Sequence, residues 1–586
     1  MSLLTSWGRD LDAESVLGEH PRPQLVREGW RVLNGWWDCA FTAAEAGRPA
    51  DWTQRILVPF SPEAPLSGVG RRLTAGEALW YRRTIEAAPP GRRVLLHFGA
   101  VDRHTTVWID DVEIGRHDDG YLPFDFEVTA ALAAPGPHEL VVRVTDPTDA
   151  EPGARGKQSS TPGGIWYTPQ SGIWQTVWTE TVPQRHVERL HLDPLLEQSA
   201  VRVTVHAEAG APARVRVLAA GRVVAEAQVP VGEATELTLA EVRAWSPADP
   251  FLYDVEVELG DDRVRSYFGL RSLGTVTGRD GMRRLTLNGA PILHAGLLDQ
   301  GYWPDGLLTP PSDAAMIHDI QTARDLGFTM LRKHIKIEPA RWYHHCDRLG
   351  MLVWQDMVNG GGKYRPSLIT VPAFLPWWRL DDRKHRRWFA RDDAADRAAF
   401  REATRRTVDL LRDAPSVVLW VPQNEGWGQF DSLDIAREVR ELDPSRPIDH
   451  VSGWHDQGGG DLASLHVYFR RFRMPSRRRV RGRAVALTEF GGYSLPIPGH
   501  RFSEREFGYK RFRDAAAFRA AIEKLWRREL EPAVRAGLAA FVYTQLSDVE
   551  DEVNGVISYD REVLKLDPQR MRELNAELAA AFGVGA

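Results

Sequence analysis

The chain has 586 residues, several times the usual size of one domain, and this length predicts two or three domains. Its apolar fraction of 43% is ordinary for a globular protein with large cores. The net charge of −6 lacks the basic excess of a general nucleic-acid binder, so we expect no nucleic-acid partner.

Tryptophan is abundant, with 21 residues against 13 tyrosines. A single Trp most commonly packs in a core, but it can also form an apolar platform on which a sugar ring stacks. The two cysteines, Cys39 and Cys346, are far apart and predict no disulfide framework. The first residues show no basic segment followed by an apolar one, and no apolar run is long enough to span a bilayer. We therefore expect a cytoplasmic protein without a membrane partner.

The pattern is all-β over the first 274 residues. Short alternating strands such as RRVLLHFGAV (92–101) and HELVVRVTD (138–146) predict an antiparallel, jelly-roll-like sandwich over residues 1–185. Stricter alternation follows, as in VRVTVHAEA (201–209), and predicts an immunoglobulin-like sandwich over residues 186–274. Because no Cys…Trp…Cys signature is present, the second prediction depends on spacing alone. We interpret this module as a spacer.

Apolar strands alternate with helical segments after residue 274. Repeated βα units over roughly 300 residues predict a parallel sheet covered by helices and favour a closed (β/α)8 TIM barrel over residues 275–586. An open doubly wound sheet is the alternative. It would carry a Gly-rich phosphate loop after its first strand, and the sequence shows none.

Polar residues end the apolar strands of this segment. In VVLWVPQNEGWG (417–428) an apolar strand runs into an amide, a carboxylate and glycines. The C-terminal ends of barrel strands share one mouth, where chemistry takes place. The residues at the predicted strand ends are His334, Asp356, Asn424, Glu425, His466, Tyr468, Glu489, Tyr543 and Gln545.

Glu425 and Glu489 are the candidates for catalysis, at the ends of the strands that we count as the fourth and the seventh. Two facing carboxyl groups suit acetal hydrolysis, in which one gives a proton to the leaving oxygen and the other, ionised, attacks or stabilises the anomeric carbon. A Glu at a strand end is more often solvated or salt-bridged. Both residues end apolar strands, however, and Gly426 and Gly491 follow within two positions.

The motifs together resemble the family 2 glycoside hydrolases, which include β-galactosidases, β-glucuronidases and β-mannosidases. The matching pieces extend over nearly the whole chain and keep the same order of three domains. They are SGIWQTVW (171–178), LNGAPILHAGLLDQGYWPDG (287–306), LRKHIKIEPARWYHHCDRLGMLVWQDM (331–357), WVPQNEGWG (420–428), HVY (466–468) and LTEFGGYS (487–494).

The resemblance implies a retaining exo-β-glycosidase with Glu489 as nucleophile and Glu425 as general acid/base, acting on a carbohydrate without a cofactor. Tyr468 matches the tyrosine beside the nucleophile, and Tyr543 stands where relatives often carry Trp. β-Galactosidase-like activity is favoured, and β-glucuronidase-like or β-mannosidase-like specificity is the alternative. The substrate-binding residues that we expect are Asn424, Tyr468, His334, Asp356, His466, Trp427, Tyr543, Gln545 and Trp166.

The chain departs from the family pattern at several places. No Glu-x-His pair follows the third strand, so we expect no essential metal. No Asn-x-Lys motif for a substrate carboxylate is found, which favours a neutral sugar. Trp166 and Tyr167 stand where some relatives carry an acidic sugar ligand, so a stacking wall replaces it, and this weakens the galactoside preference.

Two further segments have open roles. The basic run 470–483 is either a solvated loop, the common case, or a surface for an acidic substrate. The insertion 360–390, with Phe374, Trp377, Trp378 and Trp388, either packs on the barrel or walls its mouth. A non-catalytic carbohydrate-binding relative, an inverting enzyme and a homo-oligomer remain alternatives.

Overall fold

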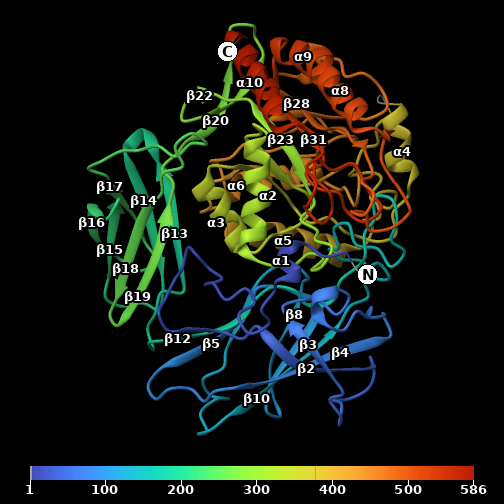
Figure 1. Ribbon diagram of the computed structural model, residues 1–586. Coiled ribbons are helices and arrows are strands. Elements are labelled where there is room, and N and C mark those ends of the chain that lie inside the picture. The colour runs from blue at the N-terminus through green and yellow to red at the C-terminus, as the bar shows by residue number, and fades with distance from the viewer. Residues whose placement is uncertain (1–2, 376–377, 586) are drawn as a thin grey trace.

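The computed structural model describes residues 3–375 and 378–585 and contains three bodies (Figure 1). A first sandwich, in blue, lies at the bottom of the view, a second sandwich, in green, lies at the left, and a barrel runs from yellow-green to red above them. The predicted fold class is confirmed. The boundaries predicted at residues 185 and 274 stay predictions. Within the described residues no helix is both long and apolar enough to cross a membrane.

The first sandwich consists of two antiparallel sheets. One has the order β1 (Trp30–Val32), β12 (Val177–Val182), β5 (Arg93–Phe98), β9 (Phe124–Glu127). The other has the order β3 (Gln54–Val58), β2 (Gly35–Ala43), β4 (Glu77–Ile85), β10 (His138–Thr145), β7 (His104–Ile109), β8 (Val112–Asp118). Buried side chains from both sheets, such as Leu79 and Leu96, form one core between them. The short strands β6 (Val101–Asp102) and β11 (Gly172–Ile173) pair beside it.

The second sandwich is smaller and also antiparallel. Its sheets are β13 (Arg189–Leu195), β14 (Ala200–His206), β17 (Ala234–Thr238), and β16 (Arg222–Val229), β15 (Ala213–Ala219), β18 (Tyr253–Leu259), β19 (Asp262–Phe268). In β15 alternate residues are buried, as the sequence alternation predicts. No member of the candidate site lies in this body.

The third body is a nearly closed barrel of parallel strands. In chain order its strands are β23 (His294–Asp299), β24 (Met330–Lys333), β25 (Leu352–Asp356), β26 (Val417–Val421), the segment 448–452, β27 (Leu462–Val467), β28 (Ala484–Gly491) and β31 (Leu538–Thr544). The segment 448–452 makes only isolated parallel bridges, to Trp420 and Asn424. Strands β20 (Leu273–Thr277), β21 (Arg283–Leu287) and β22 (Ala290–Pro291) join the barrel to the second sandwich.

Helices cover the outside of the barrel, and α2, α5 and α8 begin at polar caps. The side chains of Ser312, Asp393 and Asp514 accept hydrogen bonds from backbone N–H groups in the first turns of α2, α5 and α8. The helices are α2 (Asp313–Asp325), α3 (Ala340–Leu349), α4 (Ser367–Phe374), α5 (Ala394–Leu411), α6 (Ser432–Leu442), α7 (Arg477–Val480), α8 (Ala515–Leu525), the π-helix η3 (Trp526–Leu530), α9 (Glu531–Arg535) and α10 (Pro568–Gly585).

Strand β26 shows why its sequence is apolar throughout. Leu419 and Val421 belong to the cluster inside the barrel, whereas Trp420 belongs to the cluster between the strands and the helices. All five residues are buried, because a barrel strand has no solvent face. The strand is therefore a rigid support for the polar residues that follow it.

Candidate active site

The side chains of Glu425 and Glu489 meet at the mouth of the barrel. One carboxylate oxygen of each residue and a ring nitrogen of His466 all lie within 4.8 Å of one another. His466 Nδ1 lies 2.5 Å from Oε1 of Glu425 and 3.3 Å from Oε2 of Glu489. Two carboxyl groups at this separation can flank a single carbon atom.

The backbone around Glu425 holds its side chain in a strained position. Glu425 has a φ of +52°, in the left-handed region that a non-glycine residue rarely occupies, and Gly426 follows with a φ of +84°. The N–H group of Glu425 donates to the carbonyl of Ser452 at 2.9 Å, which ties this turn to the next barrel segment. Trp427 Nε1 donates to Oε2 of Glu425 at 3.1 Å.

A second glycine allows the turn to close against the insertion. A Cβ at Gly428 would lie 2.1 Å from the carbonyl oxygen of Gly360. That contact is far too short, so the insertion can approach the acid-bearing turn only because residue 428 lacks a side chain.

Glu489 has the stronger hydrogen-bond donors. The hydroxyl of Tyr468 donates to its Oε2 at 2.5 Å, and Nη1 of Arg332 donates to its Oε1 at 3.2 Å. The ring of Tyr509 stacks on Tyr468, with centroids 3.8 Å apart, and fixes the orientation of the phenol. A cation and a phenol both favour the ionised form of Glu489.

Burial raises the pKa of both carboxyl groups. In Glu489 the nearby charge of Glu425 raises the pKa further, whereas His466, Arg332 and Tyr468 oppose the rise. In Glu425 burial is opposed by the charge of Lys157 and by the Trp427 hydrogen bond. One proton shared between two close carboxyl groups suits acid/base chemistry, with the proton on the group that lacks the direct cation.

Arg332, which the sequence reasoning missed, supports the floor of the site. Its guanidinium pairs with Asp356 through two N–H groups, at 2.8 and 3.0 Å, and donates to Oδ1 of Asn424 at 2.8 Å and to Glu489. The only available signal is a cation within the apolar strand TMLRKH, since a buried charge needs a partner.

Asp356 is therefore a support rather than a free sugar ligand. Its side chain is fully buried, and both carboxylate oxygens accept hydrogen bonds from Arg332. Burial raises its pKa to about 7, and Arg332 opposes the rise. These hydrogen bonds favour a structural role for Asp356 over the sugar-binding role expected from the sequence.

We expect Arg332→Met to lower the free energy of unfolding by about 3–5 kcal/mol, because it leaves Asp356 buried without a counter-charge. Urea denaturation measures this change. The matched control, Arg332→Met with Asp356→Asn, should recover part of the stability but not the turnover, because Glu489 still lacks its donor. A loss below about 1 kcal/mol in the single variant would contradict the assignment.

A chain of polar side chains continues from Asn424 along the pocket. Its Nδ2 lies 3.0 Å from Nε2 of His334, whose Nδ1 lies 2.8 Å from Oε1 of Gln300. Burial lowers the pKa of His334 well below its usual value, so the ring is neutral and donates from Nδ1. The orientation of the Asn424 amide is thereby fixed from two sides, by Arg332 and by His334.

The same chain passes through Gln545 to the first sandwich. Gln300 donates to Gln545 at 2.8 Å, and Gln545 donates to Asn554 at 3.0 Å. Asn554 donates to Glu552 at 3.0 Å, and the hydroxyl of Tyr167 also donates to Glu552. Gln300, Asn554 and Glu552 were missed, because they lie in loops without a distinctive sequence pattern.

Aromatic rings form one wall of the mouth. Trp166 packs edge-on against Trp427, with centroids 4.9 Å apart, and stacks on Tyr364 of the insertion at 5.7 Å. Phe389 and Trp378 belong to the same cluster. The insertion therefore both packs against the rim of the barrel and forms part of the wall of its mouth. Trp377 lies outside the described residues.

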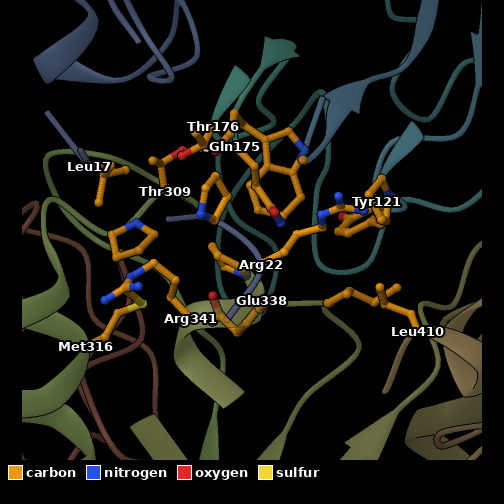
Figure 2. Close-up of a pocket in the computed structure, with 18 of the residues that line it drawn as sticks. Leu17, Arg22, Tyr121, Gln175, Thr176, Thr309, Met316, Glu338, Arg341 and Leu410 are labelled. Carbon is orange, nitrogen blue, oxygen red and sulfur yellow. Dashed lines mark hydrogen bonds between the residues drawn. The ribbon is translucent and has the colours of Figure 1, made fainter. Parts of the chain in front are cut away.

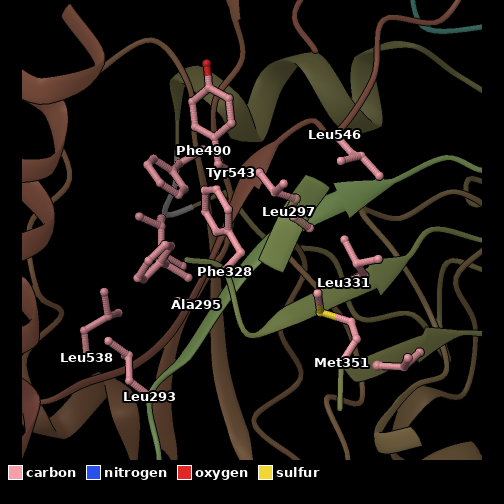
Figure 3. Packing of buried hydrophobic residues seen from close by; sticks show 14 of the residues in the cluster. Leu293, Ala295, Leu297, Phe328, Leu331, Met351, Phe490, Leu538, Tyr543 and Leu546 are labelled. Carbon is pink, nitrogen blue, oxygen red and sulfur yellow. The ribbon is translucent and has the colours of Figure 1, made fainter. Parts of the chain in front are cut away.

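Tyr543 does not reach the sugar site, which corrects its expected role. Figure 3 shows its ring near Phe490 in the apolar cluster of the barrel, and Trp526 also packs against it. The hydroxyl of Tyr543 accepts a hydrogen bond from the N–H group of Tyr493 at 3.2 Å. The next residue of β31, Thr544, lies at the site instead, 3.2 Å from the hydroxyl of Tyr468. A shift of one residue along a strand reverses the face.

Several residues of the basic run 470–483 are engaged by partners other than the carboxylates. Arg477 donates to the carbonyl of Asp280, and Arg483 pairs with Asp456. Arg471 donates to the carbonyl of Arg528. These contacts favour the reading of the run as a surface loop.

Among the described residues, two groups of side chains have the donor atoms of a metal site. The first group is Glu425, His466 and Glu489, which contains the carboxylate pair described above; His466 Nδ1 lies 2.5 Å from Glu425. In the second, His500 and Asp560 are joined at 2.7 Å, and Glu562 pairs with Arg9.

A separate cavity of about 90 Å³ lies between the first sandwich and the barrel (Figure 2). Tyr121 and Gln175 line it from the sandwich, Glu338 lines it from the β24–α3 connection, and Arg341 lines it from α3. Neither Glu425 nor Glu489 lines this cavity, so we place the candidate site at the mouth of the barrel.

Two β-sandwiches followed by a (β/α)8 barrel with facing glutamates form the architecture of a glycoside hydrolase. Three family models match the chain: "Glycosyl hydrolase 2 galactose-binding domain-like" at residues 71–172, "Glycosyl hydrolases family 2" at 185–271, and "Glycosyl hydrolases family 2, TIM barrel domain" at 310–476. The chain therefore belongs to family 2 of the glycosyl hydrolases. The matched barrel range contains Glu425, whereas Glu489 lies beyond it.

Curated relatives carry several activity names. The chain is 26% identical over 393 residues to a putative beta-glucuronidase of Formosa agariphila, a match that covers 63% of this chain and 33% of that protein. It is 24% identical to a beta-galactosidase of Halalkalibacterium halodurans, covering 62% of this chain and 35% of that protein. A beta-mannosidase B of Thermothelomyces thermophilus is 28% identical, and this match covers 72% of this chain and 55% of that protein. The match thus spans only about a third of the length of the Formosa agariphila and Halalkalibacterium halodurans proteins.

Solved structures share the fold over nearly the whole chain. A beta-glucuronidase of Ruminococcus gnavus superposes with a TM-score of 0.75 at 17% identity, covering 95% of this chain and 99% of that one. The beta-D-glucuronidase of Dictyoglomus thermophilum gives a TM-score of 0.72 at 17% identity, with 94% and 98% covered. At these identities the likeness is one of fold.

Proposed function

We propose that the chain is a retaining exo-acting β-glycosidase that removes a terminal β-linked sugar by double displacement. The observation that carries the proposal is the close approach of two buried carboxyl groups, within 4.8 Å, at the mouth of the barrel. Retaining enzymes keep these groups about 5–5.5 Å apart, whereas inverting enzymes need roughly 6.5–9.5 Å to admit a water molecule between them and the sugar.

The environments of the two glutamates assign their roles. Glu489, next to Arg332 and Tyr468, attacks the anomeric carbon as its C–O bond to the aglycone breaks. Glu425, which has Trp427 as donor and no direct cation, gives its proton to the leaving oxygen. In the second step Glu425 takes a proton from water, and this water replaces Glu489 at the anomeric carbon. The sugar leaves with its β configuration.

The surroundings suit a terminal sugar. Asn424 is oriented by Arg332 and His334, and the second N–H of its amide is available for a ring hydroxyl, a contact that strengthens in the transition state. The aromatic wall of Trp166, Tyr364 and Trp427 closes one side of the mouth. A closed side favours chain ends over internal bonds.

The names of the relatives divide between glucuronidase, galactosidase and mannosidase, and the similar solved structures cited are glucuronidases. The preference for a galactoside that the resemblance implies is not favoured over a glucuronide by these comparisons. We therefore propose the reaction without assigning the sugar from the relatives.

We expect the first sugar released from a β-glycoside to be the β anomer. Proton NMR of the anomeric signal, recorded before mutarotation, measures this. A p-nitrophenyl β-glycoside panel identifies the substrate for the measurement. Release of the α anomer would show inversion and refute the proposed roles. Failure to hydrolyse any β-glycoside in the panel would favour a carbohydrate-binding protein without catalysis.

A further inference from the structure

Lys157 is a buried lysine without an anionic partner. It comes from the first sandwich, and its relative exposure is only 8%. Among the described residues the contact recorded for its ammonium is the ring of Trp166, whose centroid lies 5.8 Å from Nζ, and no carboxylate lies within ion-pair distance. The other buried lysines, Lys333, Lys336 and Lys565, each pair with Glu or Asp at 2.6–2.8 Å.

The loop that carries Lys157 is fixed to the rim of the barrel. The N–H group of Gly156 donates to the carbonyl of Asn359 at 3.1 Å, and the carbonyl of Lys157 accepts from Tyr167 at 3.0 Å. The buried side chain of Gln158 donates to Asp102 and to Tyr121, both at 2.9 Å. The position of the ammonium is therefore set by a rigid mount rather than by an exposed, mobile side chain.

The ammonium lies beside the candidate site. Trp166, over which it lies, packs against Trp427, and Trp427 donates to Glu425. The positive charge of Lys157 opposes the rise that burial causes in the pKa of Glu425, and it adds to burial in lowering the pKa of His334. Contacts through Trp166 and Trp427, together with these charge effects, therefore place Lys157 near Glu425 and His334.

An ammonium that is held largely out of water and has no carboxylate in direct contact is incompletely compensated, and this favours an anionic ligand. An anion that enters the pocket would supply the missing partner and gain a charge-assisted hydrogen bond. A neutral sugar would leave the ammonium incompletely compensated.

We propose that Lys157 determines the specificity of the site by binding an anionic group, a carboxylate or a sulfate ester, on the terminal sugar. The inference rests on the proposed glycosidase function and names its substrate class. It replaces the expectation of a neutral sugar, which depended on the lack of an Asn-x-Lys motif. Here the cation comes from the first sandwich, not from the barrel.

The test compares anionic and neutral p-nitrophenyl glycosides on the full chain. The anionic ones are the β-D-glucuronide and the 6-sulfo-β-D-galactoside, which separate a carboxylate from a sulfate, and the neutral ones are the β-D-glucoside and β-D-galactoside. We expect the wild type to prefer one anionic substrate. Lys157→Met should lower the ratio of kcat/KM for the anionic substrate to kcat/KM for the neutral substrate by about 10- to 150-fold. This factor corresponds to the loss of one hydrogen bond to a charged group. Lys157→Arg should retain part of the ratio.

Lys363, an exposed lysine next to Tyr364 at the same rim, provides the matched control. Lys363→Met should leave the ratio unchanged, and an equal fall there would assign the effect to general surface charge. A wild type that prefers neutral sugars, or a Lys157→Met variant that loses both substrate classes equally, would overturn the proposal. An equal fall in kcat/KM for both substrate classes would indicate that Lys157 acts through the charge state of Glu425 and not through the substrate.

Calorimetry separates the inference from the proposed function. If no glycoside is hydrolysed, the proposed function fails, yet binding of free D-glucuronate and glucose 6-sulfate against D-glucose still tests Lys157. At least one of the two anionic sugars should bind tighter than D-glucose and lose about tenfold or more in affinity in Lys157→Met. Equal or tighter binding of D-glucose by the wild type would refute the inference.

Discussion

Glu489→Ala is expected to lower kcat on an activated β-glycoside by about 10⁴-fold or more, with the fold intact. Without the carboxylate, no group at the floor of the pocket can form the covalent intermediate. Arg332 and Tyr468, which contact Glu489, cannot replace it, because both are donors. Stopped assays with a p-nitrophenyl glycoside measure the loss.

Chemical rescue makes this prediction specific. Sodium azide can occupy the space vacated by the side chain and attack the anomeric carbon from the same side. One displacement then gives the α-glycosyl azide, which NMR identifies. Glu489→Gln is the control of matched size, since it leaves no space for azide and should not be rescued. A β-glycosyl azide from Glu489→Ala would assign Glu489 the other role.

Glu425→Ala is expected to lower kcat/KM by about 10²–10⁴-fold for a poor leaving group and by much less for 2,4-dinitrophenolate. A leaving group that departs as a stable anion does not need the proton that Glu425 supplies. The slow step then becomes hydrolysis of the glycosyl-enzyme, and azide should accelerate it with formation of the β-glycosyl azide. An equal loss for both leaving groups would refute the assignment.

The pH dependence follows from the same residue. Burial raises the pKa of Glu425 above its ordinary 4.5, so the acid form persists to higher pH. Activity requires this proton in the first step, and kcat/KM therefore falls as pH rises through the raised pKa. This alkaline limb should be absent in Glu425→Ala with the dinitrophenyl substrate. A limb at the same pH in the variant would assign it to another group.

The sequence predicted the architecture because its signals are periodic. Alternation in strands such as β15 and apolar runs such as β26 report burial on one face or on both, and the βα repeat then defines a barrel. Glu425 and Glu489 were found because a carboxylate at the end of an apolar strand is conspicuous.

The contacts between loops could not be read in the same way. Tyr543 was misplaced, because the register at the end of β31 decides between the pocket and the outer core, and the pattern of LAAFVYT does not fix it. Lys157 lies in a Gly- and Ser-rich loop, far along the chain from Glu425, and only tertiary structure brings the two near. Arg332 was passed over, since its three partners come from different strands.

The loop of the first sandwich that reaches the barrel carries Lys157, Trp166 and Tyr167 into the pocket. In the proposed function, bond cleavage and sugar choice are therefore encoded in separate modules. If Lys157 selects the substrate, exchange of this loop between homologous chains would transplant selectivity without disturbing Glu425 and Glu489. A barrel expressed alone would then keep both glutamates and yet lack the surface that tells one sugar from another.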